Sequence, residues 1–211
     1  MRQVAQREDI RDLILDGVDS LLGRFGFRKM TMEDLAREVG IGKGTIYLHF
    51  PSKEELTLSH IDRIAERLLT NLRGIACSSA APEERIRRML VERVLFRFDS
   101  VYHYAQNLND LLSSIRRDLL ARRETYFERE ADVLSQVLAE GRKAGVFDFS
   151  DARETARILI WSTNSLLPFS LSARELGRRE ELEERTLSIT RVLLRGLIRR
   201  TAYRRGLKRP S

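Results

Sequence analysis

Hydrophobic residues recur at intervals of three and four along most of the chain, which is the period of an amphipathic α-helix. The first segment of this kind predicts a helix over about 8–25, with Gly26 as its stop; its apolar residues are Ile10, Ile14, Val18, Leu21, Leu22 and Phe25. Later helices are predicted over about 82–98, 100–144 with a break somewhere in 107–118, 151–171 and 180–200. No segment alternates apolar and polar residues for long, so the sequence predicts an all-α fold of about nine helices.

A capping box marks the start of a second helix. Thr31 and Asp34 have the spacing at which two residues satisfy each other's free N–H groups at a helix N-terminus. This short helix should end at Gly40, because glycine tolerates the left-handed conformation of a helix stop. A third helix is then predicted over about 43–49.

A second capping box, formed by Ser52 and Glu55, follows Pro51. It predicts a long fourth helix over about 52–73. The small, weakly patterned residues at 74–81 are typical of a linker.

The net charge of the chain says little about a nucleic-acid partner, because it comes from one end. The 211 residues carry a formal charge of +7 at pH 7. Residues 195–211 contain seven arginines and lysines and no acid, so the rest of the chain is neutral. We interpret this basic tail as solvated and disordered, with binding to DNA or to an anionic membrane surface as the alternatives.

Composition favours an intracellular globular protein. Apolar residues make up 42% and charged residues 33%, which is enough to build a substantial core. The single cysteine, Cys77, excludes a disulfide within the chain and fits a reducing cytosol. Residues 1–17 lack the apolar segment of a secretory signal, and no stretch approaches the ~20 apolar residues that cross a bilayer. We therefore expect a cytoplasmic protein with no membrane partner.

Residues 31–50 describe two short helices joined by a glycine-containing turn, which is a helix-turn-helix pattern. The apolar positions of both helices should point into a shared core: Leu35, Ala36, Val39 and Ile46. The second helix then projects polar side chains outward: Lys43, Thr45, Tyr47 and His49. These groups suit the phosphates and base edges of DNA.

The sequence GIGKGTIYLHFPSKEEL at 40–56 resembles the DNA-binding signature of the TetR family of regulators. The resemblance covers about residues 8–56. It implies a three-helix DNA-binding domain, a connecting fourth helix, and a homodimer built largely by the last two long helices. The expected divisions are a DNA-binding domain at 1–51, a connecting helix at 52–74, a ligand-binding and dimerisation domain at 75–203, and a basic tail at 204–211.

Matching positions of the family motif imply two sets of DNA contacts. Residues expected at phosphates are Thr31, Tyr47, His49 and Lys53; those expected nearest the base edges are Gly42, Lys43, Gly44 and Thr45. Family members often have Ser or Thr where this chain has Gly42. Glycine is tolerated at a helix N-cap, but it offers no hydroxyl to DNA.

Apolar stripes on the last two predicted helices favour a dimer interface over a monomeric core. The residues expected there are Ala156, Leu159, Ile160, Ile189, Leu193 and Leu197. Aromatic residues gather in the middle of the same domain, where a largely apolar pocket with a few polar groups could bind a small molecule. The candidate pocket residues are Phe96, Tyr102, His103, Tyr126, Trp161, Asn164 and Phe169. Ordinary core packing is the alternative for each, and Pro168 should kink its helix by freeing the carbonyl of Asn164.

No arrangement of residues points to catalysis, a metal or a cofactor. The three histidines (His49, His60 and His103) are isolated, and Cys77 has no neighbouring histidine in the sequence. The sequence therefore predicts a protein that is not an enzyme. Its expected partners are double-stranded operator DNA, a small-molecule effector and a second copy of itself. The leading hypothesis is a ligand-responsive repressor; a small-molecule binding protein with a vestigial helix-turn-helix, and a DNA-binding activator or nucleoid-type binder, are the alternatives.

Overall fold

The computed structural model describes residues 2–168 and 177–198. In these ranges the chain forms eight α-helices and two short 3₁₀ helices, close to the predicted number, and one isolated bridge between Phe147 and Ile198 in place of any strand. The α-helices are α1 (Arg2–Lys29), α2 (Met32–Val39), α3 (Lys43–His49), α4 (Lys53–Ala76), α5 (Pro82–Val101), α6 (Leu108–Lys143), α7 (Ala152–Thr163) and α8 (Arg179–Leu197). The 3₁₀ helices are η1 (Tyr102–Asn107) and η2 (Asn164–Leu166). The all-α prediction is confirmed.

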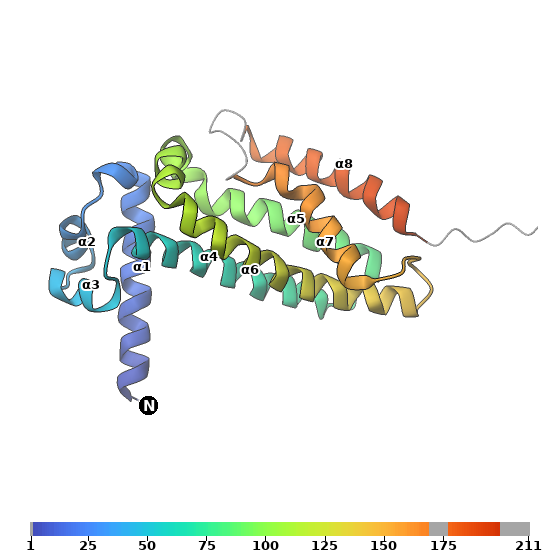
Figure 1. The fold of residues 1–211 in the computed structure, drawn as a ribbon, viewed down its shortest axis with the longest axis horizontal. Coiled ribbons are helices and arrows are strands. Elements are labelled where there is room, and N and C mark those ends of the chain that lie inside the picture. Colours follow the sequence, from blue (N-terminus) through green and yellow to red (C-terminus); the bar gives the residue numbers. More distant parts are fainter. Residues whose placement is uncertain (1, 169–176, 199–211) are drawn as a thin grey trace, which may run out of the picture.

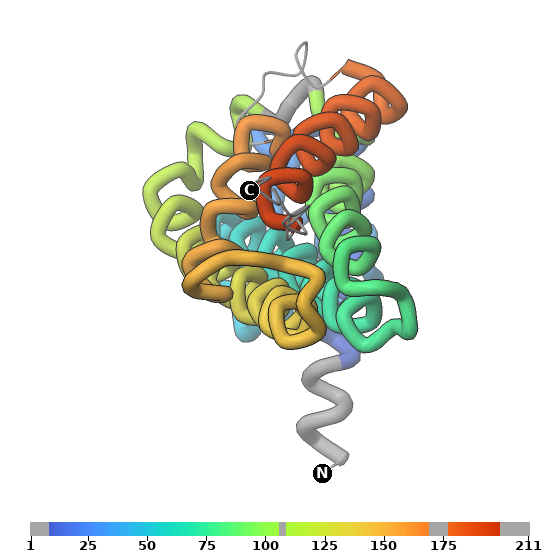
Figure 2. The backbone as a smooth tube through the Cα atoms, turned by 90° about the vertical axis from the view of Figure 1, so that its right-hand side faces the viewer, coloured from blue at the N-terminus to red at the C-terminus, as the bar shows by residue number. Residues whose placement is uncertain are grey.

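The helices are arranged as a small head and a longer bundle (Figure 1). The head consists of α1, α2 and α3, and α1 crosses the end of the bundle. The bundle contains α4 to α8, and the view along its length shows α7 and α8 together on one side (Figure 2). Helix α4 packs against α5 and α6, α6 against α7, and α5 against α8. None of the helices in the described ranges has the length and apolar character needed to span a membrane.

Two hydrophobic clusters hold this arrangement together. One joins the head to the near end of the bundle, since it contains Ile14 and Ile46 as well as Phe98 and Leu111. The other fills the far end of the bundle, between α4, α5, α6, α7 and α8. The head therefore shares a continuous core with α4, α5 and α6.

The boundaries of α2 and α3, which local signals set, agree with the prediction. Helix α2 starts after Thr31 and stops at Gly40, which has φ 70°, and α3 spans the predicted residues. Gly26 does adopt a positive φ of 69°, but the chain continues for one more turn, to Lys29, in place of the predicted end at 25. Helix α4 also continues three residues into the predicted linker.

Boundaries set by packing were predicted less well. The break expected within 107–118 lies earlier, at η1, and α6 is unbroken from Leu108. The reason is a tertiary contact: His103 of η1 packs so closely on α1 that a Cβ on Gly23 would lie 2.9 Å from its Cδ2 atom. Helix α7 ends at Thr163 rather than near 171.

The expectation that Pro168 frees the carbonyl of Asn164 is also wrong. That carbonyl oxygen accepts a hydrogen bond of 3.2 Å from the N–H of Leu167. The helix tightens into the 3₁₀ turn η2 before it reaches the proline, so the missing N–H of Pro168 falls outside the helix.

Candidate DNA-binding surface and ligand cavity

A capping box fixes the start of α2, whereas α3 begins at Gly42 without a side-chain cap and is oriented by its buried residue Ile46. The Oγ1 atom of Thr31 accepts a hydrogen bond of 3.0 Å from the N–H of Asp34, and a carboxylate oxygen of Asp34 accepts one of 3.2 Å in return. Ile46 of α3 is fully buried in the core below. Because Ile46 is held there, the opposite face of α3 must point into solvent.

That outward face of α3 carries one basic, one aromatic and one aliphatic side chain. Lys43 is exposed, and its Nζ atom lies 3.9 Å from Glu33 Oε2, at the limit of an ion pair. Tyr47 is 45% exposed and Leu48 is 81% exposed. Leu48 was missed in the sequence because it is apolar; its spacing of four from Gly44 places it on the same exposed face.

Two of the residues expected to bind phosphate, Thr31 and Lys53, are engaged inside the head. Thr31 is the cap described above. Lys53 donates to the carbonyl oxygens of Met30 at 2.9 Å and Arg28 at 3.4 Å, and its Nζ atom lies 4.4 Å from the centre of the Phe27 ring. Burial lowers the pKa of the Lys53 ammonium from its usual value.

Thr45 and His49 are half-buried in α3, which leaves only part of each side chain facing outward. The imidazole of His49 lies beside the ring of Phe50, with the two ring centres 6.4 Å apart.

Polar contacts tie α1 of the head to the bundle. The carboxylate of Asp19 on α1 lies 3.3 Å from the Nε2 atoms of both His60 on α4 and His103 on η1. Burial alone would raise the pKa of Asp19, but its contact with His60 and the charges of His60, His103 and Arg63 outweigh burial and lower it. Arg63 on α4 also pairs with Asp16 at 2.8 Å. These contacts link the position of α1 to the positions of α4 and η1.

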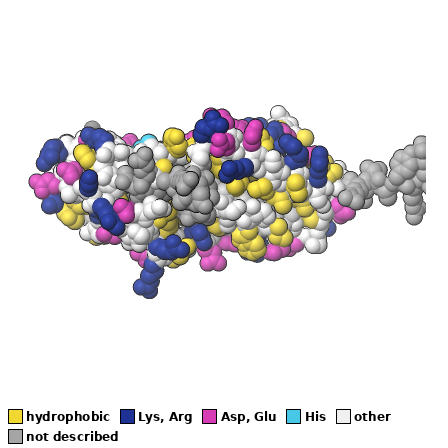
Figure 3. Space-filling view, turned by 90° about the horizontal axis from the view of Figure 1, so that it is seen from above, with side chains coloured by type: hydrophobic (Ala, Val, Ile, Leu, Met, Phe, Trp, Pro, Cys, Tyr) yellow, Lys and Arg dark blue, Asp and Glu magenta, His cyan; other side chains and the backbone are white. Residues whose placement is uncertain are grey.

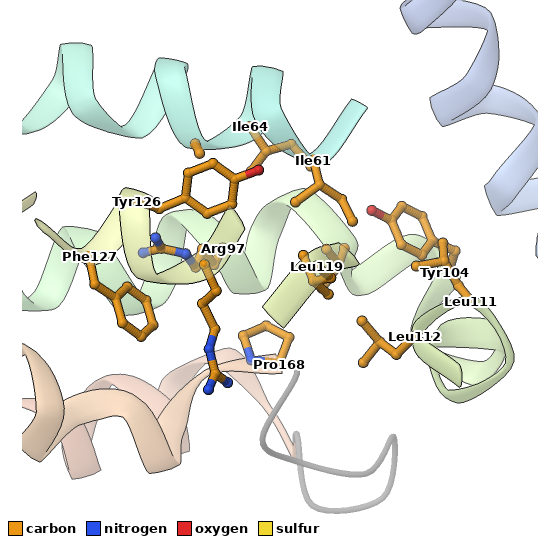
Figure 4. A pocket seen from close by; sticks show the side chains of 13 residues that line it. Ile61, Ile64, Arg97, Tyr104, Leu111, Leu112, Leu119, Tyr126, Phe127 and Pro168 are labelled. Carbon is orange, nitrogen blue, oxygen red and sulfur yellow. The ribbon is translucent and has the colours of Figure 1, made fainter. Parts of the chain in front are cut away.

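An apolar cavity lies between α4, α5 and α6 at the near end of the bundle (Figure 4). Its free volume is about 70 Å³. Its described walls are Ile61, Ile64, Ala65, Arg97, Val101, Tyr104, Leu111, Leu112, Leu119, Arg123, Tyr126, Phe127 and Pro168. This volume is well below the ~300–1,000 Å³ of typical ligand pockets, so a ligand of ordinary size would have to push the walls apart.

Tyr126 is the one described residue of the predicted pocket set that lines this cavity, and its hydroxyl donates to Asp62. Burial, reinforced by that contact, raises the pKa of the phenol. Phe96 and His103 line a separate polar hollow of about 370 Å³ between α1, α4, α5 and η1.

Three other members of the predicted pocket set lie elsewhere, and Phe169 lies outside the described residues. Trp161 and Tyr102 are each 56% exposed, so the prediction that they line the pocket is wrong. Both side chains face away from the bundle, which helical spacing alone does not reveal. Asn164 accepts a hydrogen bond from Arg93 instead of facing the cavity.

A buried charged cluster lies directly behind the cavity wall. Arg93 is fully buried and donates to Glu130 Oε2 at 2.6 Å, to Thr163 Oγ1 at 2.8 Å and to Asn164 Oδ1 at 2.6 Å. Arg97 pairs with the other carboxylate oxygen of Glu130 and donates to the carbonyl of Arg93 at 3.0 Å. The cluster joins α5, α6 and α7. Nothing in the sequence pattern distinguished these residues from the many exposed charges of the same helices.

Comparison with known proteins identifies the head. Residues 14–59, from α1 to the first turns of α4, match the family model of bacterial regulatory proteins of the tetR family. The chain is 28% identical over 148 residues to the HTH-type transcriptional repressor KstR2 of Mycobacterium tuberculosis, covering 66% of this chain and 72% of that protein. The chain belongs to the TetR family of transcriptional regulators.

Further similarity covers part of the chain in sequence and most of it in fold. The uncharacterised HTH-type regulator YuxN of Bacillus subtilis is 30% identical over 78 residues, and the match spans 37% of this chain but only 27% of YuxN. A TetR/AcrR-family regulator from Thermobifida fusca superposes with a TM-score of 0.64 at 25% identity, covering 93% of this chain and all of that one. The head is thus the DNA-binding helix-turn-helix domain of the TetR family.

The α7 residues that were predicted to form the dimer interface of this TetR-family chain do not lie on its outer surface. Ala156, Leu159 and Ile160 are almost fully buried in the core of a single chain, so the expectation that they form an interface is wrong. They fill the face of α7 that packs on α6, and a core-facing stripe has the same period as an interface stripe.

The predicted interface residues of α8 are only partly buried: Ile189, Leu193 and Leu197. The exposed large apolar side chains of α7 and α8 are instead Ile158 at 47%, Trp161 at 56% and Val192 at 71%. Hydrophobic side chains are interspersed with basic ones over the part of the molecule formed by α8 (Figure 3). These three, of the nine large apolar side chains that are exposed among the described residues, lie on two neighbouring helices, where they could form part of a protein contact surface.

Proposed function

We propose that this chain is a repressor that binds an inverted-repeat operator as a homodimer and releases it when a small, largely apolar effector enters the cavity. In this proposal, residues 1–51 bind DNA, the helix from 52–74 connects, and residues 75–203 bind the effector and the second subunit. KstR2, which is 28% identical to this chain, is named as a repressor. This supports repression over activation.

The observation that carries the proposal is the double role of α4. Its N-terminus is capped by Ser52, three residues after the last residue of α3, and Lys53 holds the end of α1. Two to three turns further on, Ile61, Ile64 and Ala65 of the same helix form a wall of the cavity. An effector that pushes this wall outward therefore moves the support of the recognition helix α3.

The size of the response follows from linkage. In helix-turn-helix dimers the two recognition helices bind half-sites about 34–36 Å apart. A small rotation of α4 in each subunit would change the distance between the two α3 helices, so that they no longer match the spacing of the half-sites. An effector that favours the displaced state by ~1–3 kcal/mol lowers operator affinity about 5- to 150-fold. Operator DNA must weaken effector binding by the same factor.

The DNA contacts follow from the exposed face of α3. Gly42, Lys43, Gly44 and Thr45 lie nearest the base edges, and Tyr47 and His49 reach phosphates. Leu48 adds an apolar contact, which suits the methyl group of thymine. Thr31 and Lys53 take positioning roles instead, because their polar side-chain atoms already bond inside the head.

Lys43→Ala is expected to weaken operator binding by ~1–3 kcal/mol and to relax preference at one base position, because the variant loses a donor to a base edge. Tyr47→Phe removes only a hydroxyl and should weaken all sequences about equally. Gel shifts with the DNA upstream of the protein's own gene, across a salt series, measure both effects. Arg87→Ala, at a partly exposed position on α5, is the control and should bind as the unmodified protein does.

These measurements also separate the alternatives. A vestigial helix-turn-helix gives no specific retention, and a nucleoid-type binder retains every sequence alike with a steep salt dependence. If Lys43→Ala and Tyr47→Phe both keep the original affinity and salt slope, α3 is not the recognition helix.

A further inference from the structure

The charged residues among the described walls of the cavity are both basic. Among its described lining residues, Arg97 on α5 and Arg123 on α6 are the charged ones, and the rest are apolar apart from two tyrosines. Figure 4 shows Arg97 among the apolar side chains Ile61, Leu119 and Phe127. The side chain of Arg97 is only 9% exposed, so water does little to screen its charge.

Arg97 belongs to the buried cluster behind the wall, and that cluster is unbalanced. It contains two guanidinium groups, those of Arg93 and Arg97, and one carboxylate, that of Glu130. Within the described residues, both oxygens of Glu130 are already used, one by each arginine. One positive charge is therefore left over in a site that is almost completely buried.

The hydrogen bonds show where the excess charge is least satisfied. Arg93 uses Nε and both terminal nitrogens on Glu130, Thr163 and Asn164. Arg97 uses its two terminal nitrogens on Glu130 and on a backbone carbonyl, but a guanidinium has five N–H donors in total. Burial and then the neighbouring charge of Arg97 oppose Glu130 and lower the pKa of Arg93 to about 10. Arg97 is the member of the cluster that lines the cavity, so it brings the excess charge to the cavity wall.

We propose that the cavity binds a small monocarboxylate with an apolar chain. The carboxylate meets the Arg97 wall, and the chain lies among the leucine, isoleucine and phenylalanine side chains. A single negative charge on the ligand balances the excess positive charge of the cluster. An uncharged ligand would leave that positive charge buried without a counter-charge, which is unfavourable. The proposal rests on the proposed function in one respect, namely that this cavity is the effector site.

The first test compares octanoate with octan-1-ol, which has the same carbon chain and no charge, by titration calorimetry at pH 7. Octanoate is expected to bind about 10- to 100-fold more tightly, as hydrogen bonds to charged groups do relative to neutral ones. Butanoate and hexanoate probe the length that the cavity accepts. Equal affinity for octanoate and octan-1-ol overturns the proposal.

The second test removes the charge. Arg97→Met should abolish the preference for octanoate and leave octan-1-ol binding unchanged. The variant should fold, because Arg93 and Glu130 remain as a one-to-one pair. Arg97→Lys, which keeps the charge, should retain much of the preference, and Arg87→Met on the exposed side of the same helix should retain all of it. If Arg97→Met keeps the preference, or Arg97→Lys loses it entirely, the proposal fails.

Operator binding separates this inference from the proposed function. A preference for octanoate with no change in operator affinity supports the anion site and overturns effector coupling. Equal binding of octanoate and octan-1-ol, both of which release operator, overturns the anion site and supports effector coupling. If neither compound binds, the inference falls, and gel shifts without any ligand still test repression.

Discussion

Val192→Glu is expected to make the protein monomeric and to lower its operator affinity about 100- to 10,000-fold. The loss is large because a dimer holds two half-sites at once, and the second contact gains from the high effective concentration created by the first. Val192 is 71% exposed on α8, and the proposed interface continues onto α7 through Ile158 and Trp161. A glutamate there would bury an unpaired charge in an apolar contact, which is costly.

Sedimentation velocity and gel shifts on one sample set measure the two effects together. Leu120→Glu is the matched control, because Leu120 is also a large exposed apolar residue, 43% exposed, but lies on α6. It should stay dimeric. Trp161 is the one tryptophan of the chain, so its emission should shift to longer wavelength in the Val192→Glu monomer. A Val192→Glu protein that sediments as a dimer places the interface elsewhere.

Glu130→Gln should be the most destabilising conservative substitution in the bundle. It leaves the shape unchanged but removes the only carboxylate that, among described residues, pairs with two buried arginines. Breaking a buried pair by removing one partner costs ~3–5 kcal/mol, because the other charge stays buried. For a chain of this size that corresponds to a melting temperature lower by about 6–20 °C in a thermal scan at pH 7.

The pH dependence of stability provides a second readout. Burial alone would raise the pKa of Glu130, but the charges and hydrogen bonds of Arg97 and Arg93 prevail and lower it. A lowered pKa in the folded state means that the carboxylate contributes its full stability above its unfolded value of 4.5, and loses it as the pH falls through the folded pKa. This acid-dependent loss should be missing in Glu130→Gln.

Glu84→Gln serves as the control for this substitution. Glu84 pairs with Arg87 on the surface of α5, where an ion pair is worth at most about 1 kcal/mol. If Glu130→Gln costs no more than Glu84→Gln, the buried cluster does not stabilise the fold.

The features that were predicted correctly from the sequence are those that depend on residues close together in the chain. The Thr31–Asp34 capping box, the left-handed stop at Gly40 and the cap at Ser52 each involve residues three or four apart, so the chain specifies them wherever it folds. The outward face of α3 followed in the same way, because burying Ile46 leaves only one other side for Lys43 and Tyr47. These local rules predicted the bounds of α2 and α3 and the start of α4.

Which partner covers each apolar stripe depends on how the helices pack against one another. Ala156, Leu159 and Ile160 have the spacing of an interface, but α6 covers them and leaves Trp161 outside. Helical periodicity records that a face is buried, not what buries it. The start of α6 was likewise set from a distance, by the packing of His103 against Gly23.

The charge behind the cavity wall shows the same limit most clearly. Arg93 and Glu130 are 37 residues apart on helices rich in exposed arginines and glutamates, and no local pattern marks them as buried. The sequence shows where the charged residues lie along the chain, whereas the packing of the helices determines which of them are buried away from solvent. That desolvation, decided by how α5, α6 and α7 pack together, is what turns an ordinary surface residue type into the electropositive wall of a cavity.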